Sequence, residues 1–372
     1  MLAPTFETFK KEFLRGKNQV VFKRITADLD TAVSLMLKLT NAKKNTFLLE
    51  SVTGGEVKGR YSIIGMDPDL VWECFGEKGR LKKKKNGKFS RFSECVDKPL
   101  IALRKVIANS KISLPQGLPH MSSGLFGYLG YDIIRLVEDL PKINKDSLSL
   151  PDAVMMRPEI IVIIDNVKGE LIIVTPVWQT NYKDSRSAYE SAKTRIKTVV
   201  KKMESKIKTV GVKENQLNSD AKPKSNVSKK DYLGTIEKAK EYISEGEIFQ
   251  VVTSQRWSIP FKLPPFSLYR ALRRTNPSPY MFFFNMGKYQ VVGASPEILV
   301  KVHDRKVTIR PIAGTRPRGQ TFIEDQKLED ELLNDEKERA EHLMLLDLGR
   351  NDVGRVSKFG TVKPTEKFVI EK

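Results

Sequence analysis

Residues 157–175 read RPEIIVIIDNVKGELIIVT, and this stretch decides the class of the fold. Two runs rich in Ile and Val, Arg157–Asp165 and Glu170–Thr175, flank the polar segment Asn166–Gly169. Apolar, β-branched runs of this length separated by a short Asn- and Gly-containing segment are typical of a β-hairpin. We therefore predict two antiparallel strands joined by a tight turn over residues 157–175.

Further strands and helices are predicted on both sides of this hairpin. Before it, the predicted strands are Gln19–Ile25, Thr46–Glu50, Arg60–Gly65, Asp69–Phe75 and Gly79–Lys84, with an amphipathic helix Asp30–Thr40 that Asp30 is placed to cap. After it, they are Ile248–Trp257, Tyr280–Asn285, Tyr289–Gly293, Ile298–His303 and Lys306–Ile312, followed by helices Glu324–Asn334 and Glu336–Gly349. Because strands and helices do not alternate regularly, the predicted class is α+β, with sheets packed under segregated helices.

The length of 372 residues fits about two domains. A long polar helix, Asn181–Lys208, precedes a stretch that is polar, contains Gly and Pro and has almost no apolar residues. We expect domains at residues 1–209 and 228–372 with a linker at 210–227. The second domain opens on a capping-box pattern, Ser228 to Asp231. The helix behind it is expected to bury one face, formed by Tyr232, Ile236, Ala239 and Ile243.

Composition excludes several classes of protein. Hydrophobic residues make up 40% of the chain and charged residues 30%, which is enough to bury a core and excludes wholesale disorder. The formal net charge is +20, but the excess of lysines lies at Lys82–Lys85 and in the Lys-rich stretch Lys193–Lys230. Neither cluster interleaves Arg and aromatic residues as a phosphate-tracking groove does. A solvated surface is favoured over nucleic-acid binding.

The same sequence predicts a cytoplasmic protein without membrane association. Its two cysteines, Cys74 and Cys95, cannot make a disulfide framework, which favours a reducing compartment. The N-terminus carries Glu7 and Glu12 and has no apolar core of a signal peptide. The longest apolar runs have the length of a strand, far short of a membrane span.

The densest group of chemically useful residues is the segment Arg310–Gly319, which leaves a predicted strand with three arginines, one threonine and two glycines. Such a loop offers backbone N–H groups, a hydroxyl and guanidinium groups to a carboxylate ligand. A basic surface turn is the competing interpretation. Neither is excluded by composition alone.

Two glutamates on the last predicted helix form a second candidate. Glu338 and Glu341 are three residues apart and therefore share a helix face. Glu341 lies at the edge of an apolar stripe, where a carboxylate is either a solvated rim residue or a ligand of a hard cation. The three histidines, His120, His303 and His342, have neither metal-site nor triad spacing, and no cysteine lies in a reactive motif.

Five segments together carry a resemblance to a known family. They are Leu48–Ser51 (LLES), Pro279–Phe282 (PYMF), Gly293–Glu297 (GASPE), the Pro311–Gly319 loop, and Glu338–Asp352 (ERAEHLMLLDLGRND). Their order and sequence resemble the chorismate-utilising enzyme family, and within it the anthranilate-forming members. The resemblance runs from about residue 20 to the end of the chain. It implies a two-domain fold with antiparallel sheets packed as a sandwich and helices on the outside.

The resemblance also implies the chemistry of the site. Gly314 and Thr315 match residues that contact chorismate, and Glu341 matches one of two glutamates that bind Mg²⁺. The metal would neutralise and orient the ring carboxylate. Glu297 matches the glutamate that protonates the departing ring hydroxyl, a general-acid role. A turn cap after Ser295-Pro296 is the competing role for Glu297.

Two positions distinguish the members of this family. Relatives that add water to the ring place a basic lysine where this chain has Gln250, which cannot take a proton from water. Relatives that make aminodeoxychorismate often carry a nucleophilic lysine where this chain has Ala313. Both residues favour direct attack by ammonia and loss of pyruvate, which gives anthranilate, at the first committed step of tryptophan biosynthesis.

An effector site and a partner are implied as well. Ser51, Pro279, Tyr280 and Met281 match the positions that bind the feedback inhibitor L-tryptophan, although a buried strand start also explains Pro279–Phe284. Ammonia is expected from a separate glutamine amidotransferase subunit, since the chain has no Cys–His amidotransferase signature. The sequence ends at Lys372 inside the chorismate-binding region, so a catalytic histidine, substrate-holding Tyr and Arg and the second metal glutamate are expected beyond it.

Three alternatives stay open at this point. An aminodeoxychorismate-forming enzyme is disfavoured by Ala313. A non-catalytic fragment that binds tryptophan or a partner subunit would use the effector residues alone. A nucleic-acid-binding protein would use the lysines of residues 1–230 and is the weakest of the three.

Overall fold

The computed structural model describes residues 1–26, 28–41, 43–52, 59–85, 87–141, 145–207 and 221–371. The chain divides into two compact units. The first consists of residues 1–207 together with 269–372, and the second of residues 208–268. This division does not follow the predicted domains, so the predicted domain boundaries at residues 209 and 228 stay a prediction.

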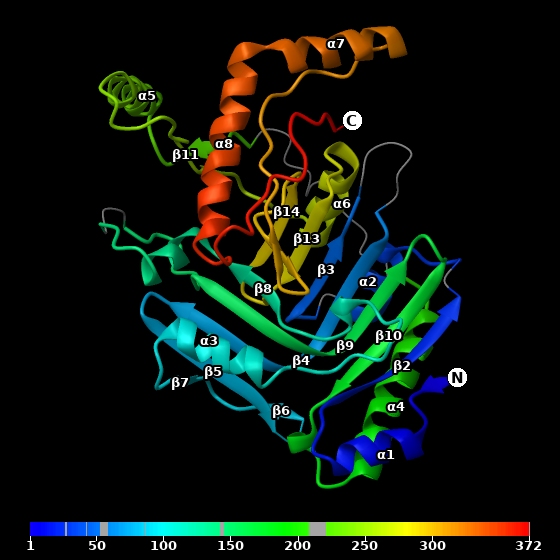
Figure 1. The fold of residues 1–372 in the computed structure, drawn as a ribbon. Helices are drawn as coiled ribbons and strands as arrows, with labels where there is room; N and C mark the ends of the chain where they lie inside the picture. Colours follow the sequence, from blue (N-terminus) through cyan, green and yellow to red (C-terminus); the bar gives the residue numbers. More distant parts are fainter. Residues whose placement is uncertain are drawn as a thin grey trace. The chain divides into compact units, whose positions relative to one another are not determined.

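A large antiparallel sheet is the frame of the first unit, and it holds twelve strands among the described residues. Its main path runs β1 (Leu2–Ala3), β2 (Gln19–Thr26), β10 (Glu170–Val177), β9 (Ala153–Asp165), β4 (Tyr61–Phe75), β3 (Thr46–Glu50), β13 (Tyr280–Asn285) and β14 (Gln290–Ser295). Strands β5 (Lys78–Lys85), β6 (Lys88–Phe89), β7 (Ser93–Glu94) and β8 (Phe126–Leu129) pair beside this path. Figure 1 shows β3 and β13 side by side, although they are far apart in the sequence.

The hairpin predicted at residues 157–175 is confirmed as β9 and β10. Its turn contains Gly169, whose φ of 63° lies in the left-handed region that glycine adopts without steric cost. The Asp165 carboxylate accepts the backbone N–H groups of Val167 and Lys168, both at 3.2 Å. The turn is therefore fixed by its own side chain as well as by its glycine.

Strand β4 is one continuous strand where the sequence predicts two. The register against β9 shifts between Pro68 and Leu70, so the proline and its neighbours make an irregularity rather than an end. Asp69, within this irregularity, is buried and accepts two hydrogen bonds from Arg157, at 2.8 and 2.6 Å. This ion pair holds the backbone in place where the ladder is interrupted.

Helices pack against the sheet and supply much of its burial. Helix α4 (Ser185–Met203) packs against β10 and β2 and contacts both α1 (Phe6–Leu14) and α2 (Ala32–Thr40). Helix α1 also contacts β2, α2 contacts β3 and β4, and α3 (Pro99–Ala108) packs against β5. The predicted helices at 30–40 and 181–208 are shorter in the structure. Thr31, not Asp30, caps α2, and Asp184 caps α4. Asp30 instead accepts hydrogen bonds from Ser34 and Lys38.

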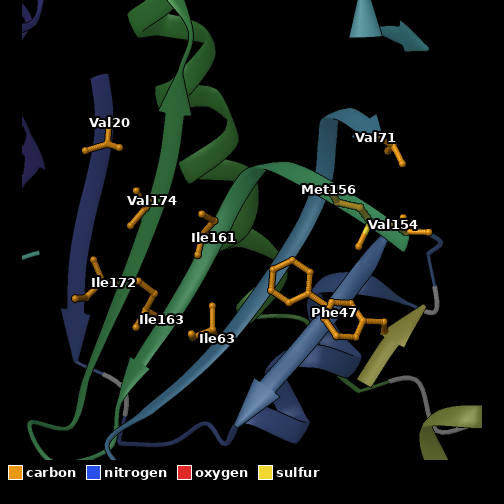
Figure 2. Packing of buried hydrophobic residues seen from close by; sticks show 11 residues of the cluster. Val20, Phe47, Ile63, Val71, Val154, Met156, Ile161, Ile163, Ile172 and Val174 are labelled. Carbon is orange, nitrogen blue, oxygen red and sulfur yellow. The ribbon is translucent and has the colours of Figure 1, made fainter. Parts of the chain in front are cut away.

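The core between strands is aliphatic, with one stacked aromatic pair. Figure 2 shows the side chains of Val20, Val174, Ile161, Ile163 and Ile63 reaching from neighbouring strands on one face of the sheet. Phe47 extends this layer toward β3 and stacks on Phe126 with ring centroids 4.7 Å apart. Continuous Ile and Val runs are buried on both faces, which explains why they do not alternate with polar residues.

The rest of the first unit carries the residues of interest. Helix α6 (Pro265–Thr275) ends before β13, and a small hairpin of β15 (Lys301–His303) and β16 (Lys306–Thr308) follows β14. Helices α7 (Phe322–Asn334) and α8 (Glu336–Gly354) come after the Arg310–Gly319 loop. The strands of the small hairpin and the helices α7 and α8 were predicted, whereas α6 was not. The hairpin strands are shorter than the predicted ranges Ile298–His303 and Lys306–Ile312.

The second unit contains helix α5 (Lys229–Ser244) and the short strands β11 (Lys224–Ser225) and β12 (Trp257–Ser258). The start of the helix is confirmed, since the Ser228 hydroxyl accepts the Asp231 N–H at 3.1 Å. Two predictions here are wrong. Among the described residues, the run Ile248–Arg256 pairs with no other strand and stays irregular. The apolar face of α5 is not buried, and Ile243 is 46% exposed.

The structure confirms a mixed α+β class with a large antiparallel sheet. The finer arrangement, sheets packed as a sandwich, stays a prediction. Within the described ranges, every helix is too short or too polar to cross a membrane.

Candidate active site

Glu297 lies two residues beyond the end of β14. The Ser295 hydroxyl accepts the Glu297 N–H at 3.4 Å and donates to the Glu297 carbonyl oxygen at 3.0 Å, so a small turn follows the strand. The Glu297 carboxylate leaves this turn and accepts the backbone N–H of Ile312 at 3.0 Å. This bond ties the predicted general acid to the start of the loop that holds Gly314 and Thr315.

Gly314 occupies a place that no other residue fits without strain. Its φ is +61°, and a Cβ atom there would lie 3.0 Å from both the Glu338 Oε2 and the Leu332 Cδ1. Left-handed backbone costs L-residues about 1–2 kcal/mol even in open space. The close approach of α7 and α8 to the loop backbone therefore requires glycine at this position.

The three arginines of the loop are paired within the protein. Arg316 donates to Glu331 at 2.7 Å and to Asp335 at 2.8 Å, and it lies 3.7 Å from Glu338. The hydrogen bond to Glu331, followed by the one to Asp335, raises the pKa of Arg316. Arg318 pairs with Asp325 and Arg310 with Glu371. The guanidinium groups thus shape the loop, and its N–H groups and hydroxyl are what it offers a ligand.

Asp335 connects this loop to helix α8. Its carboxylate caps the helix by accepting the N–H groups of Lys337 and Glu338 at 3.0 and 3.1 Å. These backbone bonds, that of Glu338 foremost, and the Arg316 guanidinium lower the pKa of Asp335. The start of α8 is therefore fixed to the loop through a group that is ionised at neutral pH.

The predicted metal ligand Glu341 lies on the first half of α8, one turn after Glu338, and both are half-buried. Carboxylate oxygens are the ligands that Mg²⁺ prefers, so Glu341 fits the role of one ligand. Across the part of the chain that the structure describes, however, no group of three or more His, Cys, Asp or Glu side chains is arranged to hold a metal ion. The described residues therefore do not make a complete magnesium site.

A cavity of about 1240 Å³ lies beside the loop. It is lined by Ala313, Gly314 and Thr315, by residues 304–310 of the small hairpin and its exit, by one side of α8 and by residues 356–358, 361–366 and 368–371. Its volume is ample for a small organic ligand. The lining includes Pro296 and His342, the neighbours of Glu297 and Glu341, rather than these glutamates themselves.

The predicted effector residues are brought together by the pairing of β3 with β13. Glu50 lies opposite Met281, and just beyond β3 the Val52 N–H donates to the Ser278 carbonyl at 3.1 Å. Ser51 therefore lies next to the strand that begins with Tyr280. Met281 is 1% exposed, whereas Tyr280 is 46% exposed. Pro279–Met281 thus is a strand start, as the competing interpretation holds, and it presents Tyr280 at the surface.

Gln250 lies in the second unit, in an irregular segment, and is exposed. The loop and Glu297 belong to the first unit. The prediction for Gln250 stays a prediction.

Sequence reasoning missed one buried polar cluster next to Ser51. Glu50, whose side chain is 2% exposed, accepts hydrogen bonds from Tyr269 at 2.5 Å and from Arg273 at 3.0 and 3.2 Å. Burial, and then the neighbouring Glu50 charge, raise the pKa of Tyr269. The signal in the sequence was Glu50 itself, an acidic residue at the end of the largely apolar run Thr46–Glu50. A carboxylate that is buried with such a strand requires a hydrogen-bonding or charged partner.

Neither cysteine has the properties of a reactive nucleophile. Burial, with a smaller effect of Asp152, raises the pKa of Cys74 to about 11, and burial likewise raises the pKa of Cys95. A thiol with a raised pKa is a poor nucleophile because the thiolate is the reactive form.

Comparison with known proteins identifies the family. The family model described as "chorismate binding enzyme" matches residues 46–372. Anthranilate synthase component 1 of Cereibacter sphaeroides is 54% identical over 368 residues, which cover 99% of this chain and 73% of that protein. The protein of the same name from Pseudomonas putida is 42% identical, over 98% of this chain and 74% of the relative.

A solved structure agrees with these sequences. The crystal structure of anthranilate synthase component I from Streptococcus pneumoniae TIGR4 matches with a TM-score of 0.64 at 30% identity, covering 90% of this chain and 69% of that one. The matching residues include all five segments that carried the resemblance, from Leu48–Ser51 to Glu338–Asp352. The chain belongs to the chorismate-binding enzyme family, in the group formed by component 1 of anthranilate synthase.

Proposed function

We propose that the protein converts chorismate and ammonia to anthranilate and pyruvate. A C–N bond forms at the ring while the C–O bond to the ring hydroxyl breaks, and the hydroxyl leaves as water with a proton from Glu297. Loss of the enolpyruvyl group as pyruvate then yields the aromatic ring. The observation that carries this proposal is the hydrogen bond from Ile312 to Glu297, which holds the acid at the start of the Gly314–Thr315 loop.

Gly314 and Thr315, which line the adjoining cavity, are proposed to bind chorismate through backbone N–H groups and the threonine hydroxyl. Glu341 is proposed as one ligand of Mg²⁺, which when bound would neutralise the ring carboxylate. Gln250 supports amination, because an amide cannot take a proton from water and ammonia needs no such base. Ala313, which lines the cavity, supports direct attack because it has no nucleophile.

The proposals for regulation and assembly rest on the same family membership. We propose that L-tryptophan binds at Ser51 and Pro279–Met281 and inhibits the reaction, and that a glutamine amidotransferase subunit supplies ammonia in the cytoplasm. Residues 1–209 are proposed as the regulatory domain, 210–227 as a linker and 228–372 as part of the chorismate-binding domain. The sheets are proposed to pack as a sandwich with the helices outside.

The test uses the full-length gene product with chorismate, an ammonium salt and Mg²⁺, and follows the fluorescence of anthranilate. We expect anthranilate from the wild type and a loss of roughly 10²–10⁴-fold in turnover for Glu297→Gln, the range of a lost general acid. The matched control, Glu324→Gln, changes an exposed glutamate of helix α7 and is expected to keep turnover.

Two other results would overturn the proposal. Formation of a precursor of para-aminobenzoate, detected by chromatography, would indicate the aminodeoxychorismate-forming activity. Tryptophan binding without any turnover would indicate a regulatory or partner-binding protein.

A further inference from the structure

Two histidines that are 183 residues apart in the sequence meet at the surface of the first unit. His120 opens the short 3-10 helix His120–Ser122, and His303 is the last residue of β15. Their Nε2 atoms are 2.7 Å apart, and the two rings stand edge to face with centroids 4.5 Å apart. Neither residue belongs to the loop, the glutamates or the effector site described above.

The proton arrangement in this pair follows from a third group. Two Nε2 atoms approach to 2.7 Å only when one carries a proton and the other a lone pair. The Asp304 Oδ2 lies 3.2 Å from the His303 Nδ1, so the carboxylate favours the proton on Nδ1 and leaves the lone pair on His303 Nε2. His120 Nε2 is then the donor. The carboxylate on the remote nitrogen is the arrangement that orients histidine ligands of metals.

The geometry of the pair is close to that of a chelating site. Zn²⁺ binds imidazole nitrogen at about 2.0–2.1 Å, so two tetrahedral ligands lie about 3.3 Å from each other. The two Nε2 atoms need to separate by about 0.6 Å, and His120 needs to move its proton from Nε2 to Nδ1. The His303 side chain is 48% exposed and His120 is exposed too, so an ion and its remaining water ligands have access.

We propose that His120 and His303 bind one divalent transition metal ion, of which Zn²⁺ is the test case, through their Nε2 atoms. Asp304 orients His303, and water completes the coordination. Imidazole favours Zn²⁺ and its transition-metal neighbours over Mg²⁺, which prefers oxygen, so this site is independent of the magnesium chemistry proposed above. The bound ion would link the turn at residues 119–122 to the small hairpin that leads into the Arg310–Gly319 loop.

The experiment titrates Zn²⁺ into the tag-free full-length protein in excess Mg²⁺, with a chromophoric chelator as competitor. We expect one Zn²⁺ per chain, and loss of this binding in both His120→Gln and His303→Gln. Asp304→Asn should bind about 10–100-fold more weakly, because it keeps both ligands and loses the group that orients one. Lys306→Gln is the matched control, since Lys306 pairs with His303 in the hairpin and its change should leave binding intact.

Two further measurements test independently whether the two histidines bind the metal ion. Co²⁺ in place of Zn²⁺ should give visible absorption bands in the wild type that are absent from either histidine variant. Thermal denaturation without metal should give equal midpoints for the wild type, the two histidine variants and Lys306→Gln. Zn²⁺ should raise the midpoints of the wild type and Lys306→Gln but not those of the histidine variants. The proposal is overturned if the wild type binds no Zn²⁺, or if His120→Gln and His303→Gln bind it as the wild type does.

Discussion

Tyr280 lies directly opposite Ser295 in the antiparallel register of β13 and β14. One strand begins at the proposed effector residues, and the other ends two residues before Glu297. The next strand on the opposite side, β3, ends at Glu50 beside Ser51. The proposed regulatory and catalytic residues therefore lie at the same end of three neighbouring strands. A change in the spacing of these strands would displace both sets of residues.

This arrangement makes Ser51 a direct test of regulation. We expect Ser51→Arg to abolish inhibition by L-tryptophan, because a long cationic side chain replaces a small hydroxyl beside Tyr280. Anthranilate formation with and without tryptophan measures the effect. Ser93→Arg, an exposed serine of β7, is the control and should remain inhibited. Full inhibition of Ser51→Arg would contradict the assignment of the effector site.

Gly314 and Gly360 provide a matched pair. Both have positive φ values, +61° and +75°, but a Cβ at Gly360 would meet nothing within 4 Å. We expect Gly360→Ala to cost about 1 kcal/mol in unfolding free energy through its backbone alone. Gly314→Ala should cost more, because the methyl group also displaces Glu338 or Leu332.

The two variants should also differ in substrate binding. We expect the KM for chorismate to rise about tenfold or more in Gly314→Ala, since a small displacement of a binding loop is costly, and to stay unchanged in Gly360→Ala. Urea denaturation and steady-state kinetics supply the two measurements. Equal KM values for Gly314→Ala and Gly360→Ala would show that Gly314 is not part of the proposed chorismate site.

The buried Glu50 carboxylate predicts a large effect of losing its partner. Arg273→Met removes the guanidinium. Among the residues that the structure describes, the charge then keeps two hydroxyl partners, Tyr269 at 2.5 Å and Ser62 at 3.5 Å. We expect a loss of about 3 kcal/mol in unfolding free energy, the size found when one partner of a buried pair is removed. Arg274→Met, the exposed neighbour on α6, should change stability by less than about 0.5 kcal/mol. Similar losses for both variants would show that the Glu50 pair is not special.

Asp165 predicts a dependence of stability on pH. Burial opposes its ionisation, but hydrogen bonds from Arg60 and from the N–H groups of Lys168 and Val167 prevail and lower its pKa in the folded protein. A lowered folded pKa gives stability that is present above the unfolded value of about 3.9 and is lost as pH falls through the folded value.

Asp165→Asn should therefore be less stable than the wild type at pH 7, and the difference should shrink as the pH falls below about 4. Chemical denaturation at several pH values measures this difference. Glu77→Gln, an exposed residue in the turn between β4 and β5, is the control and should follow the wild type throughout. A difference that is constant with pH would refute the role of the charge.

Local patterns predicted what local forces decide. The β9–β10 hairpin was predictable because Ile and Val runs and the turn residues Asn166–Gly169 all favour the same structure. The start of α5 was predictable because the Ser228 cap needs only a neighbour three residues away. The residues assigned to the candidate site come from the resemblance alone, and their roles stay a prediction.

Features that depend on distant partners were not predictable. Proline in β4 indicates a break, yet the buried pair of Asp69 with Arg157 carries the strand past it. The run Ile248–Arg256 has strand-like residues but no strand pairs with it in the described part of the chain. The meeting of His120 with His303 leaves no trace in spacing, since it arises only when the small hairpin and the 119–122 turn are in place.

The pairing of β3 with β13 has a consequence for biosynthesis. Residues 46–50 leave the ribosome long before residues 281–285, and at 5–20 residues per second the interval is roughly 10–50 seconds. During that time the β3 edge, Thr46–Glu50, has one of its two strand neighbours missing and the Glu50 carboxylate has no guanidinium. Such an edge is open to pairing with other chains. The rate of translation, and chaperones that protect nascent strands, should therefore influence how much of this protein reaches its folded state.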